Sequence, residues 1–281
     1  MDAFSCAACP RRCGALRKPA QPSGGFCGMP AGFVVARAAL HQWEEPCISG
    51  QHGSGTVFFS GCSLRCVYCQ NQQISLGRYG ALVTEENLLR MFDRLIEQGA
   101  HNLNLVNPTH YAPMLAKALK KYCSPVPVIY NSGGYERVEM LKALEGLVDI
   151  YLPDLKYVDS AVSLRYSGAA DYFDYASKAI LEMSRQVGKA TFDENGVMKK
   201  GLIVRHLILP RNTAQSIKAL TWIHENLPEG TLVSLMCQYT PCGELDAFPE
   251  LTRRITHREY DKVVDQMLEP VSYTHLRAHE T

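Results

Sequence analysis

The sequence has no long hydrophobic run and almost no excess of charge of either sign. No stretch of roughly 18 apolar residues occurs anywhere in the chain, so the sequence predicts no membrane span. A basic start followed by an apolar run, which would indicate a signal peptide, is also missing. The net charge of +1 argues against binding to nucleic acid or to an anionic membrane surface. We therefore expect a cytoplasmic protein that binds neither nucleic acid nor membranes.

Cysteine, by contrast, is abundant, with 11 residues in a chain of 281. Disulfides rarely persist in the cytoplasm, so this many cysteines indicate a metal site, a cluster or a catalytic thiol. Hydrophobic residues make up 46% of the chain and charged residues 20%, a composition that supports a well-packed core. The length fits one large α/β domain with a small extra segment, or two modest domains.

The chain from residue 56 onward alternates apolar, β-rich runs with segments of helical periodicity. Six such units predict a parallel sheet with right-handed crossovers. The strands are almost continuously apolar, so the sheet is either covered on both faces or closed as a barrel. In helix-packed barrels the chemistry lies at the carboxyl ends of the strands. The predicted strands are 56–61, 103–107, 126–131, 148–155, 202–209 and 232–239, and the predicted helices follow a cap at Thr84 and occupy 111–122, 135–146, 171–187, 213–226 and 256–268.

The two ends of the chain do not follow this alternation. Residues 1–30 are rich in Cys, Pro and Gly and need a ligand or a docking surface to become ordered. Residues 270–281 have no apolar periodicity and look like a translated adapter sequence, so we assign them no structure. We therefore predict a Cys-rich N-terminal extension over 1–50, a core over 51–269 and a non-native tail over 270–281.

The most informative motif is GCSLRCVYCQN, in which Cys62, Cys66 and Cys69 follow the first predicted strand with C-x3-C-x2-C spacing. A cubane iron–sulfur cluster normally takes four cysteines. Three cysteines within eight residues leave one iron open for another ligand. The alternatives are a zinc knuckle or a set of reduced thiols. The position of the motif at the end of the first of six β/α units argues against both.

This spacing resembles the signature of the radical S-adenosylmethionine (SAM) superfamily. The resemblance implies a [4Fe–4S] cluster whose open iron binds SAM, reductive cleavage of SAM to methionine and a 5′-deoxyadenosyl radical, and a flavodoxin- or ferredoxin-type reductant. Up to residue 269 the chain resembles the PflX-like branch, which is related to pyruvate formate-lyase activating enzymes. That branch implies a partial (βα)6 barrel with a Cys-rich N-terminal extension. The supporting stretches are CAACPRRCGALR, FCG, FFSGCSLRCVYCQNQQIS, NLVNPTHY, PVIYNSGGYE, IYLPDLKY and RHLILPRNT.

The resemblance also assigns residues to SAM. It implies that Tyr68, just before the last cysteine of the motif, contacts the adenine of SAM. The family commonly has a Gly-Gly-Glu turn after the second strand, but this chain has Asn107-Pro108-Thr109-His110. In this chain Asn107 or a backbone carbonyl would then make the contact with the SAM amino group.

Further candidates follow the third, fourth and fifth strands. Asn131 opens a turn that resembles the one near the SAM methionine. Asp154 and Lys156 match the Asp-Leu-Lys of glycyl-radical activating enzymes, where Asp accepts from ribose or amine and Lys pairs with the SAM carboxylate. Arg205 is a further candidate for a carboxylate or ribose contact. Among the histidines, we expect His110 in a pocket and His206 in a structural role.

A second set of cysteines lies near the N-terminus. Cys6, Cys9, Cys13 and Cys27 have C-x2-C-x3-C-x13-C spacing, which suits tetrahedral zinc or a second iron–sulfur cluster. A bound metal would stabilise residues 1–30, which lack the apolar residues to fold alone. Unligated thiols packed in a loop are the alternative.

The leading hypothesis is a radical SAM oxidoreductase that acts on a protein or a small molecule. One version makes a glycyl radical on a partner enzyme. The rival hypothesis is a non-catalytic iron–sulfur or zinc protein that serves electron transfer or interaction. Such a protein needs neither an open iron nor a SAM pocket.

Overall fold

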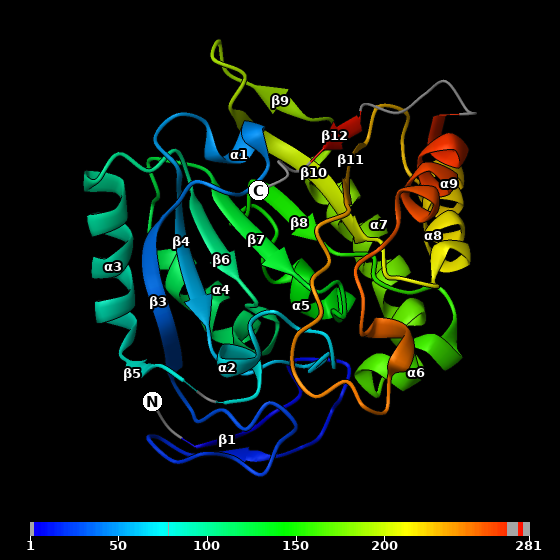
Figure 1. Cartoon of the computed structure of the whole chain (residues 1–281). Coiled ribbons are helices and arrows are strands. Elements are labelled where there is room, and N and C mark those ends of the chain that lie inside the picture. Colours follow the sequence, from blue (N-terminus) through cyan, green and yellow to red (C-terminus); the bar gives the residue numbers. More distant parts are fainter. Residues whose placement is uncertain (1–2, 78, 269–274, 278–281) are drawn as a thin grey trace.

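The computed structural model describes residues 3–77, 79–268 and 275–277, and its centre is a mostly parallel, strongly curved sheet (Figure 1). Six of its strands are parallel to their neighbours and pair in chain order. They confirm the six strands predicted from the sequence, with ends shifted by a few residues. These strands are β4 (Ser54–Phe59), β6 (Leu103–Val106), β7 (Val128–Ser132), β8 (Ile150–Pro153), β10 (Met198–Leu207) and β11 (Leu232–Met236).

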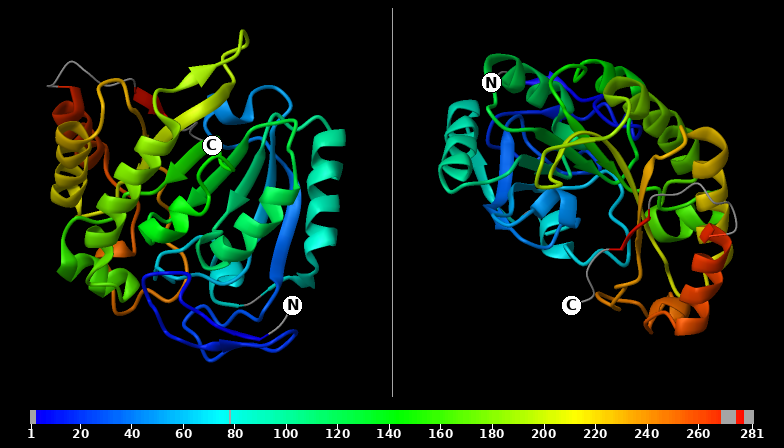
Figure 2. Two further views of the ribbon diagram at one scale, coloured as in Figure 1. Left: turned by 180° about the vertical axis from the view of Figure 1, so that it is seen from behind. Right: turned by 90° about the horizontal axis from the view of Figure 1, so that it is seen from above.

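The connecting helices lie along the outer face of this sheet (Figure 2). The predicted helices are present, and the cap is confirmed because Thr84 Oγ1 accepts a hydrogen bond from the Asn87 amide at 3.2 Å. Helix α5 is shorter than predicted, since the chain after Lys142 continues as turns. Helix α6 was not predicted; it is capped by Asp159 and ends at the left-handed Gly168. The helices are α3 (Glu85–Glu97), α4 (Ala112–Lys121), α5 (Val138–Lys142), α6 (Ser160–Ser167), α7 (Tyr172–Val187), α8 (Thr213–Asn226) and α9 (His257–Leu268), with short helices α1 (Pro46–Ser49), α2 (Gln72–Ser75), η1 (Thr109–Tyr111) and η2 (Pro249–Leu251).

Additional strands extend the sheet at both edges. Strand β3 (Phe33–His41) runs antiparallel to β4 and also pairs with β5 (Ala81–Val83), and the short β9 (Thr191–Phe192) pairs with β10. Strand β12 (His275–Arg277) pairs in parallel with β11, although we predicted no structure for 270–281. The open edge of β11 offers unpaired backbone groups, which accounts for this pairing. The rest of the predicted tail lies outside the described residues.

The N-terminal segment, residues 3–31, lies beneath the carboxyl ends of the strands (Figure 1). Its two short strands, β1 (Phe4–Ser5) and β2 (Leu16–Arg17), form an antiparallel pair. Arg11 anchors the segment by donating to the carbonyls of Ser63 at 2.8 Å and Ser167 at 2.7 Å. The docking surface expected for these residues is therefore the end of the sheet that carries the cysteine motif.

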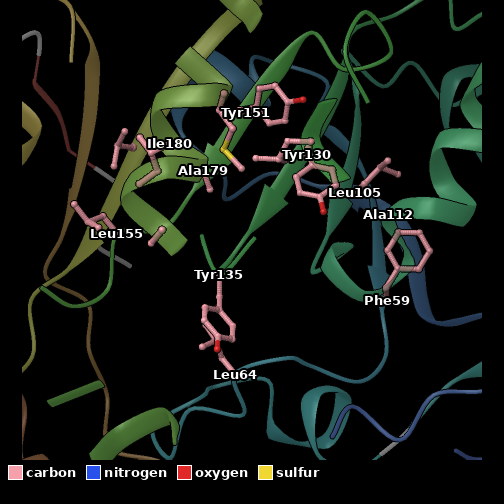
Figure 3. Close-up of a cluster of buried hydrophobic side chains, with 14 of the residues drawn as sticks. Phe59, Leu64, Leu105, Ala112, Tyr130, Tyr135, Tyr151, Leu155, Ala179 and Ile180 are labelled. Carbon is pink, nitrogen blue, oxygen red and sulfur yellow. The ribbon is translucent and has the colours of Figure 1, made fainter. Parts of the chain in front are cut away.

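Both faces of the sheet are packed with apolar side chains, as the continuous apolar strands predict. On the outer face, the rings of Tyr130 and Tyr151 lie 6.0 Å apart, under α7 (Figure 3). The inner face buries a smaller group that includes Ile129, Ile150 and Ile203, together with Ile48 of α1. None of the helices within the described ranges is long and apolar enough to cross a membrane.

Candidate active site

The cysteine loop, residues 61–71, follows β4 directly at the carboxyl end of the sheet. Each of its three thiols accepts a hydrogen bond, and such donors favour the thiolate form that binds iron. The donors come from three different parts of the chain, so the tertiary structure orients the sulfurs. They are the Leu64 and Arg65 amides at 3.3 and 3.5 Å for Cys62, Ser167 Oγ at 3.0 Å for Cys66 and Ser75 Oγ at 3.5 Å for Cys69.

The three cysteines line one cavity of about 200 Å³ together with polar residues from the ends of the strands. Burial raises the pKa of the Cys62 thiol to about 12, and the neighbouring Cys66 and Cys69 act in the same direction. Binding of iron at these thiols therefore releases protons. The lining also includes Asn107, Asn131, Asp154, Lys156 and Arg205.

Three thiols on one cavity match the number of protein ligands that a cubane cluster with one open iron takes. Among the described residues, no three Cys, His, Asp or Glu side chains are placed to hold a single metal ion. In a cubane each thiolate binds a different iron, so the sulfurs lie farther apart than the ligands of a single ion do. Cys66 is buried, Cys62 and Cys69 are half-buried, and all three line the shared cavity.

A charged network forms the opposite side of the cavity. Asp154 Oδ2 lies 2.5 Å from Lys156 Nζ, and its Oδ1 lies 3.0 Å from Arg205 Nε. Arg205 also donates to Asn131 Oδ1 at 2.5 Å and lies 3.4 Å from Glu44 Oε2. Burial alone would raise the pKa of Asp154, but Lys156 and Arg205 outweigh it and lower that pKa. The network thus holds two cations against one firmly ionised carboxylate.

Glu44 and its neighbour Glu45 bring two further carboxyl groups close to Arg205. Burial raises the pKa of Glu44 to about 7, although Arg205 opposes the shift. Asp154, Glu45 and Glu44 all act on Arg205 electrostatically. The cations Lys156 and Arg205 line the cavity and favour a ligand that carries a carboxylate. Sequence reasoning missed Glu44; the only signal was a pair of acids, Glu44-Glu45, after an apolar run.

Asn107 connects the end of β6 to the cysteine loop. Its side-chain amide donates to the Gly61 carbonyl, and its backbone amide donates to the Asn131 carbonyl at 2.8 Å. The residue has a φ of 58°, a left-handed conformation that Asn tolerates better than most residues. Asn107, which stands where the family has its Gly-Gly-Glu turn, therefore lines the cavity.

Tyr68 differs from the other residues predicted to bind SAM. Its side chain is buried and is not among the groups that line the cavity. Its hydroxyl accepts a hydrogen bond from Tyr157 at 2.7 Å, and the rings of Tyr166 and Tyr239 lie edge-on at 6.1 and 6.2 Å. The cavity lining thus gives no support to an adenine contact by this ring, which stays a prediction.

The two singled-out histidines are both interior. His110, expected in a pocket, is instead buried away from the cavity lining, with Nε2 2.7 Å from the Ser60 carbonyl. Burial lowers the pKa of His110 to about 3, so this ring is neutral at ordinary pH. His206 lies between the Leu155 carbonyl at 2.5 Å and Ser216 Oγ at 2.9 Å, as a structural residue would.

A larger hollow of about 460 Å³ lies beside the site, between the end of β11 and the start of α9. Gln70 contributes to its wall, but none of the three loop cysteines and none of the charged network does. The candidate site is therefore the smaller cavity, where thiols and charges meet.

Comparison with known proteins gives one long match at the sequence level. An uncharacterized protein of Methanocaldococcus jannaschii, MJ0674, is 28% identical over 270 residues, which are 93% of this chain and 73% of that protein.

Solved structures share the fold at low sequence identity. Streptococcus suis SuiB matches with a TM-score of 0.51 both bound to the precursor peptide SuiA (12% identity, 76% of this chain, 46% of that one) and bound to S-adenosylmethionine (13%, 78% and 45%). Methylornithine synthase, PylB, matches with a TM-score of 0.50, 15% identity, and coverage of 75% and 61%. This chain spans about half the length of SuiB. At such identities the likeness shows the fold alone.

The sequence model of the radical SAM superfamily matches residues 56–199. The matched segment runs from β4 through the cysteine loop and into β10, and so contains most of the candidate site. It covers just over half of the chain, and the sheet is of the same α/β type as in the solved neighbours. The protein therefore belongs to the radical SAM superfamily.

Proposed function

We propose that this radical SAM enzyme binds a [4Fe–4S] cluster at Cys62, Cys66 and Cys69 and SAM in the adjoining cavity. The observation that supports this most directly is the shared lining of one cavity by the three thiols and by the charged network. When bound, the reduced cluster supplies the electron that cleaves the sulfonium C–S bond of SAM to methionine and a 5′-deoxyadenosyl radical.

The residues of the cavity have distinct tasks in this proposal. The three cysteines would hold the cluster and leave it a coordination position for SAM. Lys156 pairs with the carboxylate, and Asp154 keeps Lys156 and Arg205 oriented through its two carboxylate oxygens. Asn107 and Asn131 offer polar groups at the ends of neighbouring strands.

The finer assignment is to the PflX-like branch, with a partial (βα)6 barrel over 51–269 behind a Cys-rich N-terminal extension. The Asp154-Leu155-Lys156 sequence, shared with glycyl-radical activating enzymes, supports this branch and a glycyl radical partner enzyme. The fold neighbours include SuiB, solved with a precursor peptide, and methylornithine synthase, so the proposal covers both a polypeptide and a small-molecule substrate. A cytoplasmic flavodoxin- or ferredoxin-type protein would deliver the electron.

The test is anaerobic reconstitution of the full chain with iron and sulfide, followed by dithionite and SAM. We expect 5′-deoxyadenosine from the wild type and none from the Cys62→Ala variant.

Lys156→Gln should keep its cluster but need about 10- to 100-fold more SAM, since a charge-assisted hydrogen bond contributes about 1.5–3 kcal/mol. The matched control is Lys218→Gln, at an exposed lysine of α8. A cluster-loaded wild type that forms no 5′-deoxyadenosine would overturn the proposal.

A further inference from the structure

Arg17 is a buried cation whose surroundings provide no carboxylate. Its side chain lies on β2 in the N-terminal segment and is only 1% exposed. Its guanidinium donates to the His110 carbonyl at 2.9 Å and to Cys27 Sγ at 3.3 Å. Within the described ranges no Asp or Glu forms an ion pair with it. Burial of an unbalanced charge is costly, so the surroundings of Arg17 call for an anion.

Other cysteines lie on the chain segments next to Arg17 and Cys27. The pairing of β1 with β2 places Cys6, just after β1, beside the strand that carries Arg17, with the Cys6 amide bonded to the Ala15 carbonyl at 3.0 Å. Cys9 lies close enough to Cys6 and Cys27 to interact with both electrostatically. Cys6, Cys9 and Cys27 are only 4%, 6% and 6% exposed. The thiols are thus gathered in the interior of a segment that has little other core.

Cys13 lies on the loop of the same β1–β2 hairpin as Cys6 and Cys9. It is exposed, unlike the other three. A β-carbon on Gly25, two residues before Cys27, would lie 3.1 Å from Cys13 Sγ. The fourth sulfur therefore borders the turn that carries Cys27, and all four cysteines of the motif lie on two facing loops.

Four thiolates suit zinc or an iron–sulfur cluster, and analysis for iron, sulfide and zinc separates the two. No three of the described thiols are placed to hold a single ion such as zinc. We propose that Cys6, Cys9, Cys13 and Cys27 bind a second [4Fe–4S] cluster, with Arg17 as its counter-cation and hydrogen-bond donor.

This second site is attached directly to the first. Arg11 lies between Cys9 and Cys13 in the chain, and its Nε donates to the carbonyl of Ser63, the residue after Cys62. Four thiolates on a cubane carry net negative charge, which supplies the anion that Arg17 lacks. The cluster also cross-links residues 6–27, a segment with little apolar core of its own.

The experiment removes the first site and asks what metal remains. The full-length Cys62→Ala/Cys66→Ala/Cys69→Ala variant is reconstituted anaerobically with iron and sulfide, desalted and analysed for iron, sulfide and zinc. We expect about four iron atoms per chain, against about eight in the wild type. A chain without iron, or with zinc in its place, overturns the proposal. This result does not depend on the proposed function, because the variant lacks the ligands of that site.

A complementary variant covers the case in which the triple variant does not fold. Cys6→Ala/Cys9→Ala should lose about half of the wild-type iron, while the control Cys123→Ala, at an exposed cysteine outside both sets, should lose none. Unchanged iron in the double variant contradicts the second cluster.

The midpoint potential of the remaining cluster tests the role of Arg17 separately. In the triple variant, Arg17→Gln should make the remaining cluster harder to reduce, because it removes a positive charge and a hydrogen bond to a ligand sulfur. Arg17→Lys should restore part of the midpoint potential. A potential that Arg17→Gln leaves unchanged would contradict the role of Arg17 as counter-cation.

Discussion

Glu136 is a carboxyl group in the interior of the protein, behind the turn that follows β7. It is 0% exposed, its Oε1 accepts from Thr109 Oγ1 at 2.5 Å, and its Oε2 accepts from the Tyr130 hydroxyl at 3.2 Å. Burial raises the pKa of Glu136 to about 7, and the hydrogen bonds only moderate this shift. Burial therefore favours the protonated form of Glu136 in the folded protein, although its hydrogen bonds from Thr109 and Tyr130 favour the ionised form.

This raised pKa predicts how stability depends on pH. Between about 4.5 and about 7 the folded protein keeps a proton that the unfolded chain has released, so stability falls as the pH rises through this window. Glu136→Gln has no ionisable group at this position, so it lacks this fall in stability. From pH 5 to pH 8, its stability relative to the wild type should increase by on the order of 3 kcal/mol.

Urea unfolding of the metal-free proteins at a series of pH values measures this difference. The matched control is Glu225→Gln, at an exposed glutamate of α8, whose stability relative to the wild type should not change in this way. A Glu136→Gln difference that is the same at pH 5 and pH 8 would show that Glu136 titrates normally.

At the scale of elements, the turn between β7 and α5 packs against the end of β8, which carries Asp154. The Tyr172 hydroxyl lies between the two, 2.9 Å from the Gly133 carbonyl and 2.7 Å from the Asp154 carbonyl. Gly134 has a φ of +77°, and a β-carbon there would collide with the Asp154 carbonyl oxygen. The absence of this side chain lets the two strand ends approach.

A matched pair of glycines tests this contact. Gly146 has nearly the same φ, +76°, but open space around it, so Gly146→Ala carries only the cost of the left-handed backbone, about 1–2 kcal/mol. Gly134→Ala should lose at least about 1–3 kcal/mol more, because it adds the collision, and should weaken SAM binding by displacing Asp154. Thermal unfolding and 5′-deoxyadenosine formation measure the two effects. Equal losses of stability in the two variants would mean that the turn moves away from the added β-carbon at no cost.

At the scale of the whole molecule, the cysteine loop is a point where distant parts of the chain converge. Cys66 receives its hydrogen bond from the end of α6, and Arg11 of the N-terminal segment joins the carbonyls of Ser63 and Ser167. A cluster bound to the loop would fix all of these together. Because it binds only the folded protein, its binding energy adds to stability.

We therefore expect the cluster-loaded protein to unfold at a temperature at least about 5 °C above that of the metal-free protein, since each kcal/mol is worth about 2–4 °C at this size. Anaerobic differential scanning calorimetry measures the difference. Cys66→Ala should reduce it, whereas Cys123→Ala should leave it intact. A metal-free protein as stable as the loaded one would indicate that the cluster adds no cross-link.

Local features of the sequence predicted much of this protein. The six apolar strands and the Thr84 cap depend on side chains a few residues apart, and the C-x3-C-x2-C loop brings its three thiols together within a single turn. The spacing of Cys6, Cys9, Cys13 and Cys27 likewise marked a second group of thiols. Short-range periodicity and spacing carry such information because the geometry that they require is local.

Only the tertiary structure decided which distant groups meet. Arg205 reaches Asp154, 51 residues away, because parallel pairing aligns the ends of β8 and β10, and Glu44 reaches the same guanidinium from the chain after β3. The structure also buried Arg17 against the Cys27 thiol and enclosed Tyr68 among other tyrosines. These positions depend on strand order and on the desolvation of charges, and neither can be read from a pattern along the chain.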